Sequence, residues 1–278
     1  MKNHQKNERQ IIYRHSLIVR LTHRINVLCL FFLLMSGLQI FNAHPRLYWG
    51  KYGADMDRPV IVIGSVLQNQ VLRGYVQVGS LYLTTTGVLG VSKEDGEMRA
   101  RAFPSKLTLP SWQDLGAGRH WHFFFAWLLV LNGLIYLLHG TWSGHFRRAL
   151  LPQRHQLRLC HLWQEIINHV CLRFPKGKEA RHYNVLLKIT YLLVIFILLP
   201  LMVVTGLTMS PALDAVFPFL PELFGGRPSA RTLHFILASL LVMFILLHLA
   251  MVLVSGVWNN LRAMISGRYA IEEEGDKR

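Results

Sequence analysis

The sequence is poor in cysteine and in acidic residues. Its three cysteines, Cys29, Cys160 and Cys171, make no disulfide framework, and the lack of a Cys-x-x-Cys-His motif excludes covalently attached c-type haem. There is also no Gly-rich phosphate loop, no convincing Ser/His/Asp arrangement and no iron–sulfur, flavin or molybdenum signature. These absences argue against bond-making catalysis by this chain alone.

Acidic residues number 15 against 30 basic ones, which gives a formal charge of +15. The excess is local: residues 1–24 hold six basic and one acidic residue, and residues 141–188 hold nine and two. Residues 209–230, by contrast, hold one basic and two acidic residues. Because basic loops stay in the cytoplasm, we interpret the charge as a topology signal and expect no nucleic acid partner.

Long apolar runs are abundant, in a chain that is 52% hydrophobic with a mean hydropathy of +0.30. Four runs reach the ~20 residues that a membrane-spanning helix needs. They cover residues 18–41, 120–140, 189–209 and 232–257. We therefore predict an all-α membrane protein, a four-transmembrane-helix bundle with both termini cytoplasmic, in which residues 1–278 form a single membrane domain. Membrane lipid is one expected partner.

A long periplasmic loop, residues 42–119, is predicted between the first and second spans. It contains β-like stretches at Pro59–Gly64 and Tyr75–Ser92. Loops of this length are seldom structureless in compact proteins, so a small cap or docking surface is one interpretation and a solvated insertion is the other.

The last apolar run carries His234 and His248 although it has no Lys, Arg, Asp or Glu between Thr232 and Asn260. Fourteen residues are close to four helical turns, so the two imidazoles share one face within roughly 40° and lie about 21 Å apart. Ionisable groups inside a span are costly and suggest function. The spacing suits two stacked cofactors, each taking one ligand from this helix, whereas a lone histidine would more simply bond to a neighbouring helix.

Alternating span directions supply a partner for each histidine. His23 falls at the inner level with His248, and His122 at the outer level with His234. Each pair suits the bis-imidazole ligation of a b haem. His120, about 200° round the helix from His122, is a rival that spacing alone does not exclude. His139 is the second rival, but it lies about 100° away from His122 on the helix face, which favours an interhelical or interfacial hydrogen bond.

Haem propionates need cationic partners at the membrane surfaces, and four arginines lie at span boundaries, where they are alternatively plain snorkelling anchors. They are Arg20 and Arg24 at the inner side, and Arg119 and Arg231 at the outer side. Three glycines in the spans would let a macrocycle approach the backbone, or let helices pack closely. They are Gly37, Gly133 and Gly206.

Several segments resemble the bacterial four-helix di-haem cytochrome b family, which supplies membrane subunits of nickel–iron hydrogenases, formate dehydrogenases and thiosulfate reductases. They include YRHSLIVRLTH (Tyr13–His23), WHFFFAWLLVLNGLIYLLHG (Trp121–Gly140), PLMVVTGLTMSPALDAVFPFLPELFGG and SARTLHF. The resemblance covers all four spans and is weaker over residues 51–118.

The resemblance implies that His23, His122, His234 and His248 are the axial ligands. It favours His122 over His120, because His122 occupies the Trp-His-Phe position of the family. Arg24 is a departure, since relatives usually have Trp immediately after the first ligand.

Together these features predict a di-haem b subunit of the bacterial inner membrane, holding two haem b groups non-covalently. It would pass electrons between the quinone pool and a periplasmic oxidoreductase of molybdopterin type, which the resemblance suggests as the partner. One alternative is a haem-free transporter, or a proton or metal relay, that uses the same intramembrane histidines. Another is a stand-alone quinol-dependent reductase.

Overall fold

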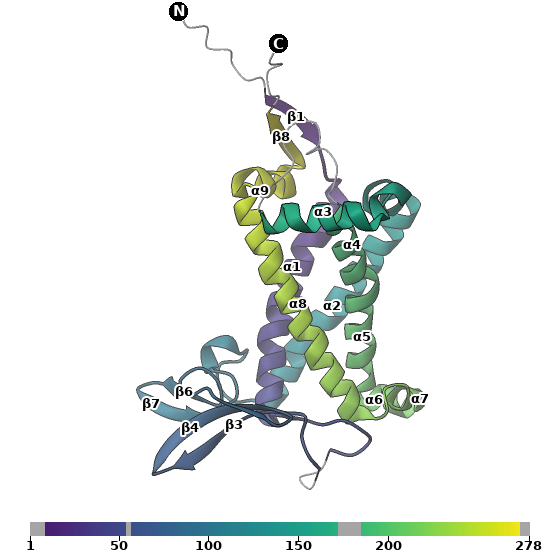
Figure 1. The fold of residues 1–278 in the computed structure, drawn as a ribbon. Coiled ribbons are helices and arrows are strands. Elements are labelled where there is room, and N and C mark those ends of the chain that lie inside the picture. The colour runs from purple at the N-terminus through teal and green to yellow at the C-terminus, as the bar shows by residue number, and fades with distance from the viewer. Residues whose placement is uncertain (1–8, 54–56, 172–184, 273–278) are drawn as a thin grey trace, which may run out of the picture. The chain divides into compact units, whose positions relative to one another are not determined.

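Four long apolar helical segments dominate the structure, which is a computed structural model describing residues 9–53, 57–171 and 185–272. Helix α1 covers Leu17–Ala43, α2 covers Leu115–Trp142 and α8 covers Arg227–Val254, and the remaining segment runs over Val185–Thr208 (Figure 1). Each is long and apolar enough to cross a membrane. Their ends lie within five residues of the bounds predicted from sequence.

The segment Val185–Thr208 is not a uniform α-helix. It consists of α4 (Val185–Leu193), the π-helical η5 (Val194–Leu198) and α5 (Leu199–Thr208). Pro200 is the second residue after the π-helical turn and has no N–H to donate, so the regular bonding pattern changes near this point.

The prediction of an all-α, plain four-helix architecture is wrong, because the described residues also form three small antiparallel sheets. One sheet has the order β2–β3–β4–β5, with bounds Arg46–Leu47, Ile61–Gln68, Val71–Val78 and Leu81–Thr84. A hairpin joins β6 (Val91–Glu94) to β7 (Glu97–Ala100), and β1 (Arg9–Tyr13) pairs with β8 (Arg268–Glu272). The last pair brings the two ends of the described chain together (Figure 1).

The longer strands are rich in β-branched residues, and the turns between them have suitable backbone conformations. Asn69 and Gln70 have φ values of 50° and 61°, and Asp95 and Gly96 have 52° and 89°. Positive φ at both central residues is typical of the tight turns that match the twist of a hairpin. The predicted periplasmic loop is therefore a folded β structure.

The remaining elements are short. They are η1 (Ser105–Leu107), η2 (Phe146–Leu150), η3 (Arg154–Leu157), α3 (Leu159–Val170), α6 (Pro211–Val216), α7 (Phe219–Leu223) and α9 (Val257–Ser266). Helix α3 is amphipathic and exposes Leu159, Trp163 and Ile166.

The chain divides into two compact units. The terminal unit comprises Met1–Arg24, Asn132–Leu199 and Leu241–Arg278, and the sheet unit comprises Ile25–Leu131 and Pro200–Leu240. Parts of α1, α2 and α8 therefore belong to each unit.

The core of the sheet unit lies where the strands meet the end of α1. Phe41 of α1 packs with Leu47 and Ile63 of the sheet, and with Ala102. Gly90, at φ +77°, allows a close backbone approach, because a Cβ atom there would lie 2.1 Å from the Gly64 carbonyl oxygen. The sheet is thus packed directly on a helix that carries part of the site described below.

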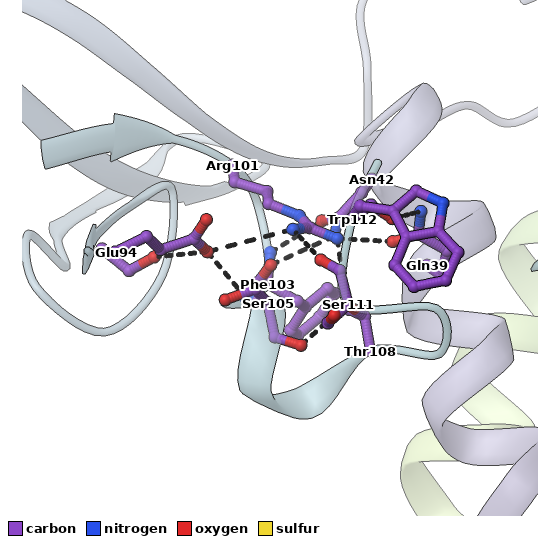
Figure 2. Close-up of polar contacts among 10 residues, drawn as sticks. Gln39, Asn42, Glu94, Arg101, Phe103, Ser105, Thr108, Ser111 and Trp112 are labelled. Atoms are coloured by element: carbon purple, nitrogen blue, oxygen red, sulfur yellow. Dashed lines mark hydrogen bonds and ion pairs between the residues drawn. The ribbon is translucent and has the colours of Figure 1, made fainter. Parts of the chain in front are cut away.

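Arg101 fixes the segment after β7 to the C-terminal end of α1 (Figure 2). Its guanidinium donates to the Gln39 Oε1 atom at 2.5 Å, the Thr108 Oγ1 atom at 2.9 Å and the Ser111 carbonyl at 2.6 Å. The Glu94 carboxylate lies 3.9 Å from the guanidinium, and the side chains of Arg101 and Glu94 are only 6% and 9% exposed.

Two further side chains of α1 complete this attachment. Gln39 donates to the Trp112 carbonyl at 2.8 Å, and Asn42 both donates to the Phe103 carbonyl and accepts from its N–H. The side-chain amides thereby satisfy backbone groups that no strand ladder pairs. Loop, sheet and α1 form one connected structure in this unit (Figure 2).

Candidate functional site

The first histidine pair lies in the terminal unit. His23 of α1 and His248 of α8 face each other with ring centres 6.4 Å apart and ring planes inclined at 55°. Phe244 stacks on the His248 ring at 5.8 Å, and Tyr191 meets its edge at 6.4 Å. The two predicted inner residues are therefore adjacent in an aromatic environment.

The second pair lies in the sheet unit. His122 of α2 and His234 of α8 have ring centres 6.3 Å apart and planes inclined at 63°. Unlike the first pair, both rings contact hydroxyl groups: His122 Nδ1 lies 3.1 Å from Ser36 Oγ, and His234 Nδ1 lies 3.0 Å from Thr205 Oγ1. Both hydroxyl residues are fully buried.

Two of the three span glycines lie against this second pair. A Cβ atom at Gly37 would meet His122 Cε1 at 3.4 Å, and one at Gly206 would meet His234 Cε1 at 3.3 Å. A Cβ atom at Gly133 would have no neighbour within 4 Å. Gly37 and Gly206 therefore make room for an imidazole edge beside the helix backbone.

The two rival histidines are placed elsewhere. The His120 side chain is exposed. His139 Nε2 lies 3.5 Å from Oγ of Ser16, the residue that precedes α1. Neither ring is part of a facing histidine pair.

Arg20 and Arg24, which are predicted to lie at the inner side, bind the end of α9. Arg20 donates to the Ile265 carbonyl at 2.6 Å, and Arg24 donates to the Met264 and Ile265 carbonyls at 3.0 and 2.8 Å. These are last-turn carbonyls that have no partner within a helix. The Arg20 Nε atom is buried and has no hydrogen-bond partner, so one donor of this side chain remains unused.

At the outer positions, Arg231 donates to the His44 carbonyl at 2.5 Å. The Arg119 guanidinium lies 5.7 Å from the centre of the Phe123 ring. A guanidinium has five N–H donors, so the bond to His44 leaves Arg231 with capacity for an anionic group.

The geometry of both pairs fits one metal ion held between two imidazoles. The ring centres lie 6.4 and 6.3 Å apart, so each pair of imidazoles would hold an ion between them. Among the residues that the structure describes, no group of three or more His, Cys, Asp or Glu side chains could hold a metal ion. Two protein ligands and four from a macrocycle match this arrangement, so the residues present fit haem b.

Sequence reasoning missed Ser36 and Thr205. Each precedes a glycine that was noted, in Met35-Ser36-Gly37-Leu38 and Val204-Thr205-Gly206-Leu207. This repeated hydroxyl–glycine pair was the available signal. The sequence alone does not show which histidine each hydroxyl contacts, because Ser36 lies 86 residues from His122 and Thr205 lies 29 residues from His234.

Comparisons with known proteins identify the family of this chain. The chain is 37% identical over 168 residues to a putative protein-methionine-sulfoxide reductase subunit, YedZ1, of Azospira oryzae, a match that covers 59% of this chain and 77% of the relative. No solved structure matches. The family model for prokaryotic cytochrome b561 matches residues 14–267, which include all four paired histidines. The predicted resemblance to membrane cytochromes b is thus confirmed, and the chain belongs to the prokaryotic cytochrome b561 family.

Proposed function

We propose that this membrane cytochrome b carries two haem b groups, with His23 and His248 as the axial ligands of one and His122 and His234 as those of the other. The observation that supports this proposal is the recurrence of one geometry, since the two pairs have ring-centre separations of 6.4 and 6.3 Å. Both pairs take one member from α8, fourteen residues apart.

Each bound haem would supply one-electron transfer, and the side chains of this chain would bind and orient it. The unused Nε–H of Arg20 is suited to a propionate of the inner group, and Arg231 to one of the outer group. Phe244 and Tyr191 would limit water near the inner pair. Residues 1–278 would act as a single membrane domain in the bacterial inner membrane.

The proposed role is to pass electrons between the quinone pool and a periplasmic oxidoreductase of molybdopterin type. The relative's name suggests a protein-methionine-sulfoxide reductase as that partner. The sheet unit supports a periplasmic contact at the outer pair, because its strands and the Arg101 network are built on the helix that also carries Ser36.

The test uses the full chain reconstituted in lipid vesicles, supplied with a short-chain quinol, while the b-haem absorbance is recorded. We expect rapid haem reduction in the wild type, and oxidation on addition of the co-purified partner. Haem that no quinol reduces would contradict the quinone assignment.

The alternatives give different outcomes in the same preparation. A protein that lacks haem but shows proton- or metal-dependent transport would be the relay. A haem protein that reduces small acceptors and never co-purifies with a large periplasmic protein would be the stand-alone reductase.

A further inference from the structure

The two histidine pairs differ in how their rings are held. Ser36 and Thr205 contact the Nδ1 atoms of His122 and His234 at 3.1 and 3.0 Å. The described residues offer the rings of His23 and His248 no hydrogen-bond partner, only each other and aromatic neighbours. The difference is therefore in hydrogen bonding and not in ring separation.

A count of protons assigns the direction of these contacts. A hydroxyl group has a single proton. Ser36 Oγ donates it to the Phe32 carbonyl at 2.6 Å, and Thr205 Oγ1 donates to the Leu201 carbonyl at 2.7 Å. A lone pair of each oxygen then faces the imidazole, so each Nδ1 carries the proton and donates it. The backbone carbonyls of Leu33 and Met202 also accept hydrogen bonds from the rings of His122 and His234, which requires the same ring N–H. Nε2 is thereby left unprotonated, as metal binding requires.

We infer that Ser36 and Thr205 are positioning residues of the outer haem site, which fix the tautomer of His122 and His234 and lower the reduction potential of that site. When the ring N–H that does not bind the metal donates a hydrogen bond, the imidazole becomes a more basic ligand. A more basic ligand favours the ferric state. The inner pair lacks this contribution. The inference rests on the proposed haem ligation and extends it to groups that touch no haem.

The adjacent glycines complete this arrangement. Each hydroxyl holds Nδ1 while the following glycine leaves room for Cε1, at 3.4 Å for Gly37 and 3.3 Å for Gly206 from the position a Cβ would take. Two consecutive residues on one helix thus fix both the rotation of a ring and its distance from the backbone. The same device occurs on α1 and on α5.

The experiment compares Thr205→Val, which keeps the side-chain shape, with Thr205→Ser, which keeps the hydroxyl. Thr208→Val is the matched control, because Thr208 is equally buried on α5 and its hydroxyl donates to the Val204 carbonyl at 2.8 Å. Ser36→Ala tests the hydroxyl beside His122, the other histidine of the pair. It replaces Thr205→Val if that variant does not accumulate. The readouts are a spectroscopic redox titration of the purified full chain and its haem retention.

His234→Ala should remove one component of the redox titration, which identifies the outer haem. We expect Thr205→Val and Ser36→Ala to raise the potential of that component and to weaken haem retention at that site about 10–100-fold. Thr205→Ser and Thr208→Val should match the wild type. Unchanged potential and retention in Thr205→Val and Ser36→Ala, or an equal shift in Thr208→Val, would overturn the inference. A wild type with two haems would in that case leave the proposed function standing, whereas a wild type without haem would remove both.

Discussion

His122 on α2 and His234 on α8 face each other with ring centres 6.3 Å apart. His23 and His248 repeat this relationship at 6.4 Å in the other compact unit. Each pair lies wholly within one unit, so we expect a substitution at one pair to leave the other intact. Sites that share no partners behave independently.

Gly206→Ala should impair the outer site although alanine is the better helix former by about 1 kcal/mol. The new methyl group would lie 3.3 Å from His234 Cε1 and push the ring from its position. We expect roughly tenfold weaker haem retention at one of the two sites, measured by haem loss to apomyoglobin.

The control for this substitution is Gly116→Ala in the first turn of α2, where the methyl group would meet only Asp114 Oδ1 at 3.4 Å. Its haem retention should equal that of the wild type. Equal retention in the Gly206 and Gly116 variants would show that the glycine does not hold the ring.

Arg20→Ala and Arg24→Ala should have different effects although both side chains bind carbonyls of α9. Each change should loosen α9 by about 0.5–1.5 kcal/mol, seen as faster amide exchange in Val257–Ser266. Only Arg20→Ala should also shift the potential of the inner haem, because only Arg20 has a buried unpartnered Nε. If the inner haem has the same potential in both variants, Arg20 only caps α9 and does not contact a propionate.

Arg101→Met should destabilise the β structure of the sheet unit by about 3–5 kcal/mol, because it leaves the buried Glu94 carboxylate without its cation. We expect faster proteolysis within residues 101–114. Arg99→Met is the control, since Arg99 pairs with Glu97 on the surface at 4.0 Å with side chains 55% and 79% exposed. Similar proteolysis of both variants would contradict a structural role for the Arg101 network.

His15, which precedes α1, should contribute to acid sensitivity. Burial, followed by the nearby charge of Arg14, lowers the pKa of His15 from 6.5 to about 4. Between these values the unfolded chain binds the proton and the folded chain does not, so stability falls as the pH decreases from 6.5 towards 4. Below about 4 this group causes no further loss.

His15→Gln should therefore lose less thermal stability than the wild type between pH 7 and pH ~4.5, as measured by its melting temperature. His120→Gln, at an exposed position, is the comparison. A wild-type-like loss in the His15 variant would contradict the assignment.

The membrane spans and the histidine positions could be predicted because their signals are local. An apolar run of sufficient length has few folded alternatives, and a histidine within it is conspicuous. Helical spacing then placed His234 and His248 on one face without any knowledge of other elements.

The sheets and the supporting residues depend on contacts between distant parts of the chain. The β-like stretch Pro59–Gly64 was recognised, yet its pairing with Tyr75 and its neighbours needed the whole sheet. The β1–β8 pair joins the two ends of the described chain, which no local pattern indicates. Arg24 was interpreted from its place beside His23, but its partners on α9 lie 240 and 241 residues away.

The most direct test is the number of haem groups per polypeptide in the purified wild type, His248→Ala and His234→Ala, combined with redox difference spectra. We predict two b-type haems in the wild type and one in each variant, with the remaining haem differing in potential between the two variants. A wild type without haem despite adequate haem supply, or two haems retained in both variants, would contradict the account.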